Sequence, residues 1–166
     1  MTERSFSPQE IFAVLHRHGV GYVAIGGIAA NAHGSRRLTL DVDIIPAPEE
    51  SNYERLAAAL DELGAPASAV DSGFRSLDPR DSFDLARADI LKIPTAAGDL
   101  DVLNGSVGAA PYDDLRKRSV EVEVRGTPVW IASLDDVIAM KRAAGRPKDL
   151  RDIADLTGSD EPPTTP

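Results

Sequence analysis

The chain has 166 residues, of which 42% are hydrophobic and 27% are charged, and this is the composition of one globular domain. It contains no cysteine, which excludes disulfides, thiolate metal ligands and cysteine nucleophiles, and three scattered histidines do not favour a structural zinc site. No apolar run approaches the ~20 residues that cross a bilayer, and the first residues lack the apolar stretch of a signal peptide. We therefore expect a cytoplasmic protein with no membrane partner.

The net charge of −9 argues against a protein that binds nucleic acid by bulk electrostatic attraction. The charge is uneven along the chain, however. Residues 111–151 carry nine basic and seven acidic side chains, whereas the segments on either side are both acidic. A polyanionic partner would therefore have to bind this segment, which contains two basic clusters at 116–118 and 141–148.

Hydrophobic periodicity and turn residues divide the first half of the chain into helices and strands. Ser7 is typical of a helix N-cap, because its hydroxyl can accept a hydrogen bond from a backbone N–H of the first turn. Apolar and polar residues alternate over 38–45, which is the period of a strand with one buried face. The pattern predicts, in chain order, a helix from Pro8 to near His18, a strand over 20–25, a helix over 28–34, a strand over 38–45 and a helix over 52–63.

The second half of the chain predicts more strands, followed by two helices. Residues 65–88 give weak signals that fit either short strands or packed loops, and residues 158–166 have neither apolar anchors nor periodicity. We expect a domain over 1–157, a disordered tail over 158–166, and an α/β (α+β) fold in which helices flank a mixed sheet. The elements predicted downstream of residue 88 are strands over 89–93, 100–103, 120–124 and 128–131, a helix from the N-cap Ser133 to Gly145, and a helix over 148–156.

The most informative residues are Asp41 and Asp43, which lie two positions apart in a predicted strand. Side chains two apart on a strand point to the same face, so both carboxylates project together. Two like charges this close repel each other unless a cation lies between them. Mg²⁺ prefers carboxylate oxygens and keeps waters that substrate phosphates can replace. Taken alone, such a pair is more often a solvated surface than a metal site.

Gly26 and Gly27 lie between a predicted strand and a predicted helix of small residues. Glycines at such a junction let the backbone approach phosphate oxygens closely, although a tight turn that only glycine can adopt is the commoner explanation. Thr39 shares the face of the two aspartates, and Arg37 precedes it by two positions. Arg37 could reach a triphosphate, or it could be an ordinary solvated loop residue.

These pieces form one string, Gly26-Gly27-x-Ala29-x-x-x-His33-Gly34-x-x-Arg37-x-Thr39-x-Asp41-x-Asp43. The string resembles the signature of the DNA polymerase β-like nucleotidyltransferase superfamily, and it looks closest to the AbiEii-type toxins of bacterial toxin–antitoxin systems. Similar strings occur in CCA-adding enzymes and in aminoglycoside and lincosamide nucleotidyltransferases. The resemblance implies a nucleotidyltransferase-like sheet, a glycine turn that binds a nucleoside triphosphate, and paired aspartates that hold two Mg²⁺ ions.

The resemblance also implies a third carboxylate on an adjacent strand. Asp101, in the run Leu100–Leu103, is our choice because it lies more centrally in the apolar run, and Asp99 is the rival because it shares the same strand face. Besides binding metal, a third carboxylate can accept the proton of the attacking hydroxyl. Either aspartate could instead belong to an acidic strand edge.

Lys141 and the segment 145–152 carry a second part of the resemblance, to the lysine and Lys-Asp helix motifs of AbiEii-like proteins. Carried over residue by residue, Lys141 and Lys148 would neutralise phosphate charge, with Lys141 among the catalytic residues. Asp149 or Asp152 would orient these lysines or complete the nucleotide site. Without the resemblance, this segment would be interpreted as a solvated basic face.

The resemblance implies Mg²⁺-dependent transfer of a nucleoside monophosphate to an acceptor hydroxyl. The leading interpretation is a toxin that modifies the 3′ end of tRNA and has a cognate antitoxin protein as partner. The alternatives are transfer to a small molecule such as an antibiotic, transfer to a protein, and an inactive nucleotide-binding antitoxin or partner module. AbiEii-type toxins are usually longer, so their acceptor-binding region is absent here, smaller, or supplied by a partner. An RNA acceptor would require residues 116–118 and 141–148 to form one strip leading to the carboxylates.

Overall fold

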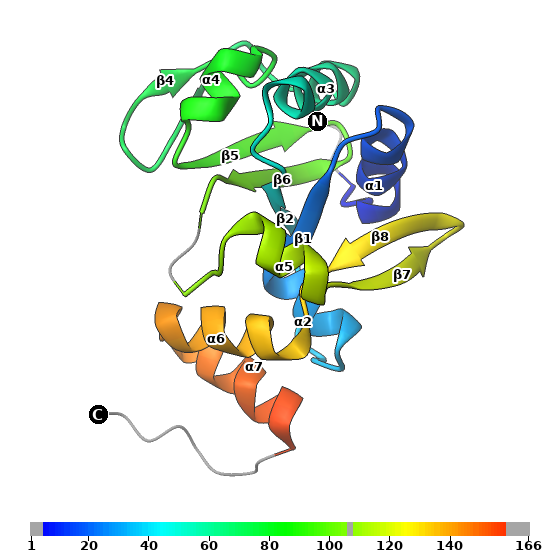
Figure 1. Ribbon diagram of the computed structural model, residues 1–166, viewed down its shortest axis with the longest axis vertical. Coiled ribbons are helices and arrows are strands. Elements are labelled where there is room, and N and C mark those ends of the chain that lie inside the picture. The colour runs from blue at the N-terminus through cyan, green and yellow to red at the C-terminus, as the bar shows by residue number, and fades with distance from the viewer. Residues whose placement is uncertain (1–4, 106–107, 159–166) are drawn as a thin grey trace.

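A computed structural model describes residues 5–105 and 108–158. The predicted tail therefore lies outside the described residues, except for Gly158. In Figure 1, α3 and α4 lie at one end of the molecule, and α6 and α7 lie side by side at the other. The elements are α1 (Pro8–Arg17), β1 (Tyr22–Ile25), α2 (Gly26–Ala32), β2 (Asp41–Pro46), α3 (Glu50–Glu62), β3 (Ala69–Val70), β4 (Ser76–Leu77), α4 (Ser82–Arg87), β5 (Ile90–Thr95), β6 (Gly98–Leu103), α5 (Tyr112–Arg118), β7 (Val120–Val124), β8 (Thr127–Ile131), α6 (Leu134–Ala144) and α7 (Pro147–Thr157).

The main sheet has six strands in the order β5-β6-β2-β1-β8-β7, and β3 and β4 form a separate two-stranded sheet. The hairpins β5–β6 and β7–β8 are antiparallel, as is the β1–β2 pair. By contrast, β2 runs parallel to β6, and β1 runs parallel to β8. The predicted fold, a mixed sheet flanked by helices, is therefore confirmed.

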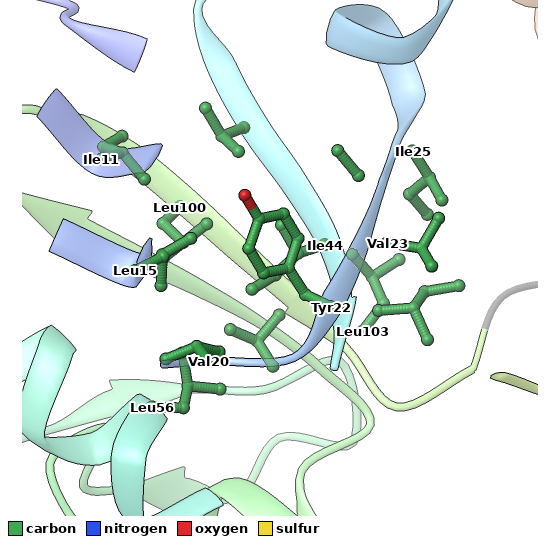
Figure 2. Close-up of a cluster of buried hydrophobic side chains, with 14 of the residues drawn as sticks. Ile11, Leu15, Val20, Tyr22, Val23, Ile25, Ile44, Leu56, Leu100 and Leu103 are labelled. Carbon is green, nitrogen blue, oxygen red and sulfur yellow. The ribbon is translucent and has the colours of Figure 1, made fainter. Parts of the chain in front are cut away.

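The core lies between the sheet and the helices α1 and α3. Figure 2 shows Ile11 and Leu15 of α1 close to Tyr22 of β1 and Leu100 of β6, and all four side chains are buried. The ring of Tyr22 also stacks on Phe12, with 6.1 Å between the ring centroids. This apolar packing fixes one face of β2 and β6, so that the aspartates of these two strands lie on the other face.

The strand predicted over 38–45 begins later than its alternation suggested. The observed strand β2 begins at Asp41, where pairing with β6 also begins. Leu38 and Leu40, which the alternation placed on the buried face, are 78% and 66% exposed. Because a strand needs a hydrogen-bonded neighbour, alternation alone could not show that residues 38–40 lack one.

The structure also corrects two other expectations. The helix α2 begins directly at Gly26, before the predicted start at residue 28, so both glycines belong to its first turn. Residues 112–118 form α5, a helix that the sequence analysis did not predict. The weakly patterned segment 65–88 contains β3, β4 and α4.

Candidate functional site

Three carboxylates converge on the polar face of β2 and β6. Along β2, Val42 and Ile44 are buried in the core, which directs Asp41 and Asp43 to the opposite face. The parallel register sets Asp43 beside Asp101. One carboxylate oxygen from each of Asp41, Asp43 and Asp101 lies within 4.8 Å of the others.

Asp99 does not belong to this cluster. It lies beside Asp41 in the register of β2 and β6, but its side chain is exposed, whereas Asp101 is only 5% exposed. Of the two aspartates that the sequence left open, the geometry therefore places Asp101 with the pair on β2.

Gly26 and Gly27 lie directly against the carboxylate strand. Gly26 has a φ of +66°, which favours glycine, and a Cβ atom at this position would overlap the carboxylate of Asp43. A Cβ atom on Gly27 would lie 2.6 Å from Oγ1 of Thr39. That hydroxyl donates hydrogen bonds to the backbone oxygen of Asp41, at 3.2 Å, and to its carboxylate, at 3.4 Å. Both glycines thus make room for the side chains of the cluster.

The cluster is short of positive charge. Burial, together with the charges of Asp41 and Asp101, raises the pKa of Asp43 to about 7. Burial also raises the pKa of Asp101, although the ammonium group of Lys92, 3.2 Å from Oδ2, opposes this effect. The other oxygen of Asp101, Oδ1, is buried and accepts no hydrogen bond from the described residues. A buried carboxylate oxygen with no donor, beside two more carboxylates, fits a divalent cation such as Mg²⁺.

The carboxylates face a cavity of about 670 Å³. Its apolar lining residues include Leu38, Leu40 and Met140 of α6. Besides the three carboxylates, charged side chains from several elements line the cavity, and these are Arg37, Lys92, Lys141, Arg146, Lys148 and Asp149. Gly26 and Gly27, in the first turn of α2, and Thr39 also line it. All six residues predicted from the sequence to bind nucleotide therefore line one cavity.

A buried network of ion pairs joins α6, α7 and the segment before β2. Asp152 accepts two hydrogen bonds from Arg37, at 2.9 and 2.8 Å, and one from Lys141, at 2.8 Å. Lys141 also lies 3.7 Å from Asp149, which accepts a hydrogen bond from Nε of Arg146 at 2.6 Å. Burial opposes ionisation of Asp152, but the bonds from Arg37 and Lys141 outweigh it and lower its pKa to about 2.

This network shows how the predicted C-terminal residues are arranged. Both carboxylates that were candidates for orienting Lys141, those of Asp149 and Asp152, contact its ammonium group. Lys141 is buried, whereas Lys148 is exposed at the edge of the cavity. Arg37 is paired with Asp152, so it is not an ordinary solvated loop residue.

The basic cluster at 116–118 does not reach the cavity. The guanidinium group of Arg116 lies 3.4 Å from the ring centroid of Trp130, and Arg118 donates two hydrogen bonds to Asp136. Arg116, Lys117 and Arg118 are all outside the cavity lining. The strip that an RNA acceptor would require therefore does not continue from α5 into the site.

Lys92 and Leu40 were given no role in the site from the sequence, and Arg146 was included there only within the basic cluster at 141–148. The position of Lys92 could have been inferred, because the turn between β5 and β6 sets the register that pairs it with Asp101. The roles of Arg146 and Leu40 depend on how α7 and residues 35–40 pack in the folded protein, and this packing cannot be predicted from local sequence periodicity.

A family model described as a nucleotidyltransferase of unknown function (DUF6036) matches residues 9–157. Among solved structures, a Thermotoga maritima protein assigned as a nucleotidyltransferase is 14% identical, with a TM-score of 0.57 over 91% of this chain and 90% of that one. The lincosamide antibiotic adenylyltransferase LnuA, solved with lincomycin, is 14% identical, with a TM-score of 0.62 over 93% and 99%. The antibiotic-resistance factor ANT(2″)-Ia, solved with adenylyl-2″-tobramycin, is 16% identical, with a TM-score of 0.59 over 92% and 86%.

No curated protein sequence is significantly similar to this chain. At 14–16% identity the structural matches establish the shared fold, and the family match establishes the relationship to nucleotidyltransferases. The more specific resemblance to AbiEii-type toxins stays a prediction. Within residues 5–105 and 108–158, no helix is long and apolar enough to span a membrane.

Proposed function

Because the chain belongs to the DUF6036 family of nucleotidyltransferases, we propose that it transfers a nucleoside monophosphate from a nucleoside triphosphate to an acceptor hydroxyl. The acceptor oxygen forms a bond to the α-phosphorus, the bond between the α- and β-phosphates breaks, and pyrophosphate leaves. The observation that carries this proposal is the convergence of Asp41, Asp43 and Asp101 around a buried oxygen that has no hydrogen-bond donor. Mg²⁺ held by these three carboxylates would neutralise charge on the reacting phosphate and favour ionisation of the acceptor hydroxyl.

The protein's own residues position the reactants in this proposal. Asp101 accepts the proton of the acceptor hydroxyl, because it is the carboxylate contributed by a second strand, beside the pair on β2. Gly26 and Gly27 let the triphosphate approach the cluster. Lys148, exposed at the edge of the cavity, binds phosphate oxygens. Lys141 contributes positive charge from within its network of carboxylates.

We favour a small hydroxylated molecule as the acceptor. The exposed apolar side chains of Leu38 and Leu40 in the cavity lining suit a compact organic molecule better than a polyanion. The basic residues Arg116 and Arg118 are held by Trp130 and Asp136, outside the cavity. Two structural neighbours, solved with lincomycin and with adenylylated tobramycin, support this choice.

A toxin that acts on the 3′ end of tRNA, with a cognate antitoxin, is the second candidate. It is favoured by the exposed basic residues Arg142, Lys148 and Arg151 of α6 and α7, of which Lys148 lines the cavity. These residues offer contacts to RNA phosphates without the cluster at 116–118.

Labelling tests both the reaction and the acceptor. The protein is incubated with each α-labelled nucleoside triphosphate, Mg²⁺ and a cell extract, and the label is then sought in the RNA, protein and small-molecule fractions. We expect label in the small-molecule fraction with the wild-type protein. Asp43→Asn should lose at least about 10³-fold of this transfer, because a metal ligand is lost, and should keep its thermal stability, because repulsion is relieved.

Label in RNA would move the assignment to the tRNA candidate. Label in no fraction, with any nucleotide, would favour the inactive binding module. Transfer that persists in Asp43→Asn at the wild-type rate would contradict the role given to the carboxylates.

A further inference from the structure

The hairpin β5–β6 places a lysine directly against the carboxylate cluster. Lys92 of β5 pairs in register with Asp101 of β6, so their side chains project from the same face of the sheet. The ammonium Nζ lies 3.2 Å from Oδ2 of Asp101. The second oxygen, Oδ1, stays buried without a hydrogen-bond donor among the described residues.

Of the other cations that line the cavity, Lys148 is exposed and makes no ion pair with the carboxylate cluster, and the remaining three are paired with aspartates of α7. Arg37 and Lys141 pair with Asp152, and Arg146 pairs with Asp149. Among the ion pairs of the described part of the chain, the one that reaches the cluster is made by Lys92. This single positive charge therefore faces three carboxylates.

The two partners differ in their freedom to move. The side chain of Asp101 is 7% exposed, whereas that of Lys92 is 73% exposed on a flexible four-carbon stem. A divalent cation that bound Asp43 and Asp101 would lie close to the ammonium group and repel it. Lys92 can move into solvent, and Asp101 cannot.

We propose that Lys92 is a displaceable counter-ion of the catalytic cluster. It neutralises Asp101 in the metal-free protein, competes with the incoming divalent cation, and moves into solvent when the site is loaded. This inference rests on the metal site of the proposed function. It makes Lys92 a positioning residue, which holds the carboxylates in place before loading and weakens the affinity of the site for the bare ion.

Calorimetric titration with Mn²⁺, in the absence of nucleotide, tests the proposal. Lys92→Met should bind Mn²⁺ about tenfold more tightly than the wild type, because the competing charge is gone. The same variant should melt at a lower temperature in the presence of a chelator, because Asp101 loses its counter-ion. Lys92→Arg keeps the charge and should bind within about twofold of the wild type.

The matched control is Lys117→Met, which removes the same charge from an exposed position outside the cavity and should bind Mn²⁺ like the wild type. If Lys92→Met fails to fold, Lys92→Gln replaces it as the uncharged variant in the titration. Equal or weaker Mn²⁺ binding by the folded, uncharged Lys92 variant would overturn the inference. In that case, loss of Mn²⁺ binding in Asp43→Asn would still support the metal site of the proposed function. No Mn²⁺ binding by the wild-type protein would overturn both the inference and the metal site.

Discussion

Two groups of aspartates in this molecule have opposite charge balances. On β2 and β6, three carboxylates share one lysine, and burial with mutual repulsion raises the pKa of Asp43 to about 7. Between α6 and α7, Asp149 and Asp152 contact three cations, and hydrogen bonds lower the pKa of Asp152 to about 2. Carboxylates that are already satisfied stabilise the fold, whereas carboxylates that lack counter-charge are suited to binding a cation.

The largest effect should separate the two aspartates of β6. Asp101→Asn should lose at least about 10³-fold in nucleotidyl transfer, because both a metal ligand and the proton acceptor are lost. Asp99→Asn should stay within about twofold of the wild type, because its side chain is exposed and outside the cluster. Initial rates of label transfer measure both variants. If both variants lost transfer activity to a similar extent, the pairing of Asp43 with Asp101 would not be what distinguishes the two aspartates of β6.

The next largest effect should be a loss of stability when the second group, Asp149 and Asp152 with their paired cations, is changed. Asp152→Asn should lower the free energy of unfolding by about 3 kcal/mol, because Lys141 then keeps a buried charge without its nearest partner. Asp155→Asn changes an exposed aspartate on the same helix and should change stability by less than about 0.5 kcal/mol. Urea unfolding gives both values. A loss in Asp152→Asn no greater than in this control would show that the network contributes little to stability.

The pH dependence of stability should have opposite sign in the two groups. In the metal-free protein, folded Asp43 still binds its proton between about pH 4 and pH 7, while the unfolded chain has lost it. Stability should therefore fall as the pH rises through this window, by about 1.4 kcal/mol per pH unit at most. The contribution of Asp152 is present above about pH 4 and is lost as the pH falls towards 2.

Urea unfolding between pH 3 and pH 8, with a chelator present, resolves the two contributions. In Asp43→Asn the decline between pH 4 and pH 7 should flatten, while the loss of stability below pH 4 remains. An unchanged decline in this variant would show that Asp43 is not the titrating group.

Local periodicity was enough to predict the carboxylates, because strands direct alternate side chains to one face whatever the rest of the chain does. It placed Asp41 and Asp43 together, and the family resemblance added Asp101. It failed at Leu38 and Leu40, because the start of a strand depends on where a neighbouring strand begins to pair.

The partners of charged side chains were harder to predict, because they come from distant parts of the chain. Arg37 and Asp152 are separated by 115 positions, and no spacing rule links them. The role of Asp152 as the shared acceptor of Arg37 and Lys141 becomes visible only when α7 is packed against α6.

The pairing of Arg37 with Asp152 ties the last helix to the segment that leads into the carboxylate strand. A protein shortened to end before Pro147 would lose both carboxylates that pair with Lys141 and would leave its ammonium group without a partner in a cavity that it shares with Asp41, Asp43 and Asp101. Such a truncation would be expected to disturb the carboxylate cluster as well as the surface it exposes. Shortened variants made for expression or crystallisation should therefore keep α7, even though it lies at the far end of the molecule from α3 and α4 (Figure 1).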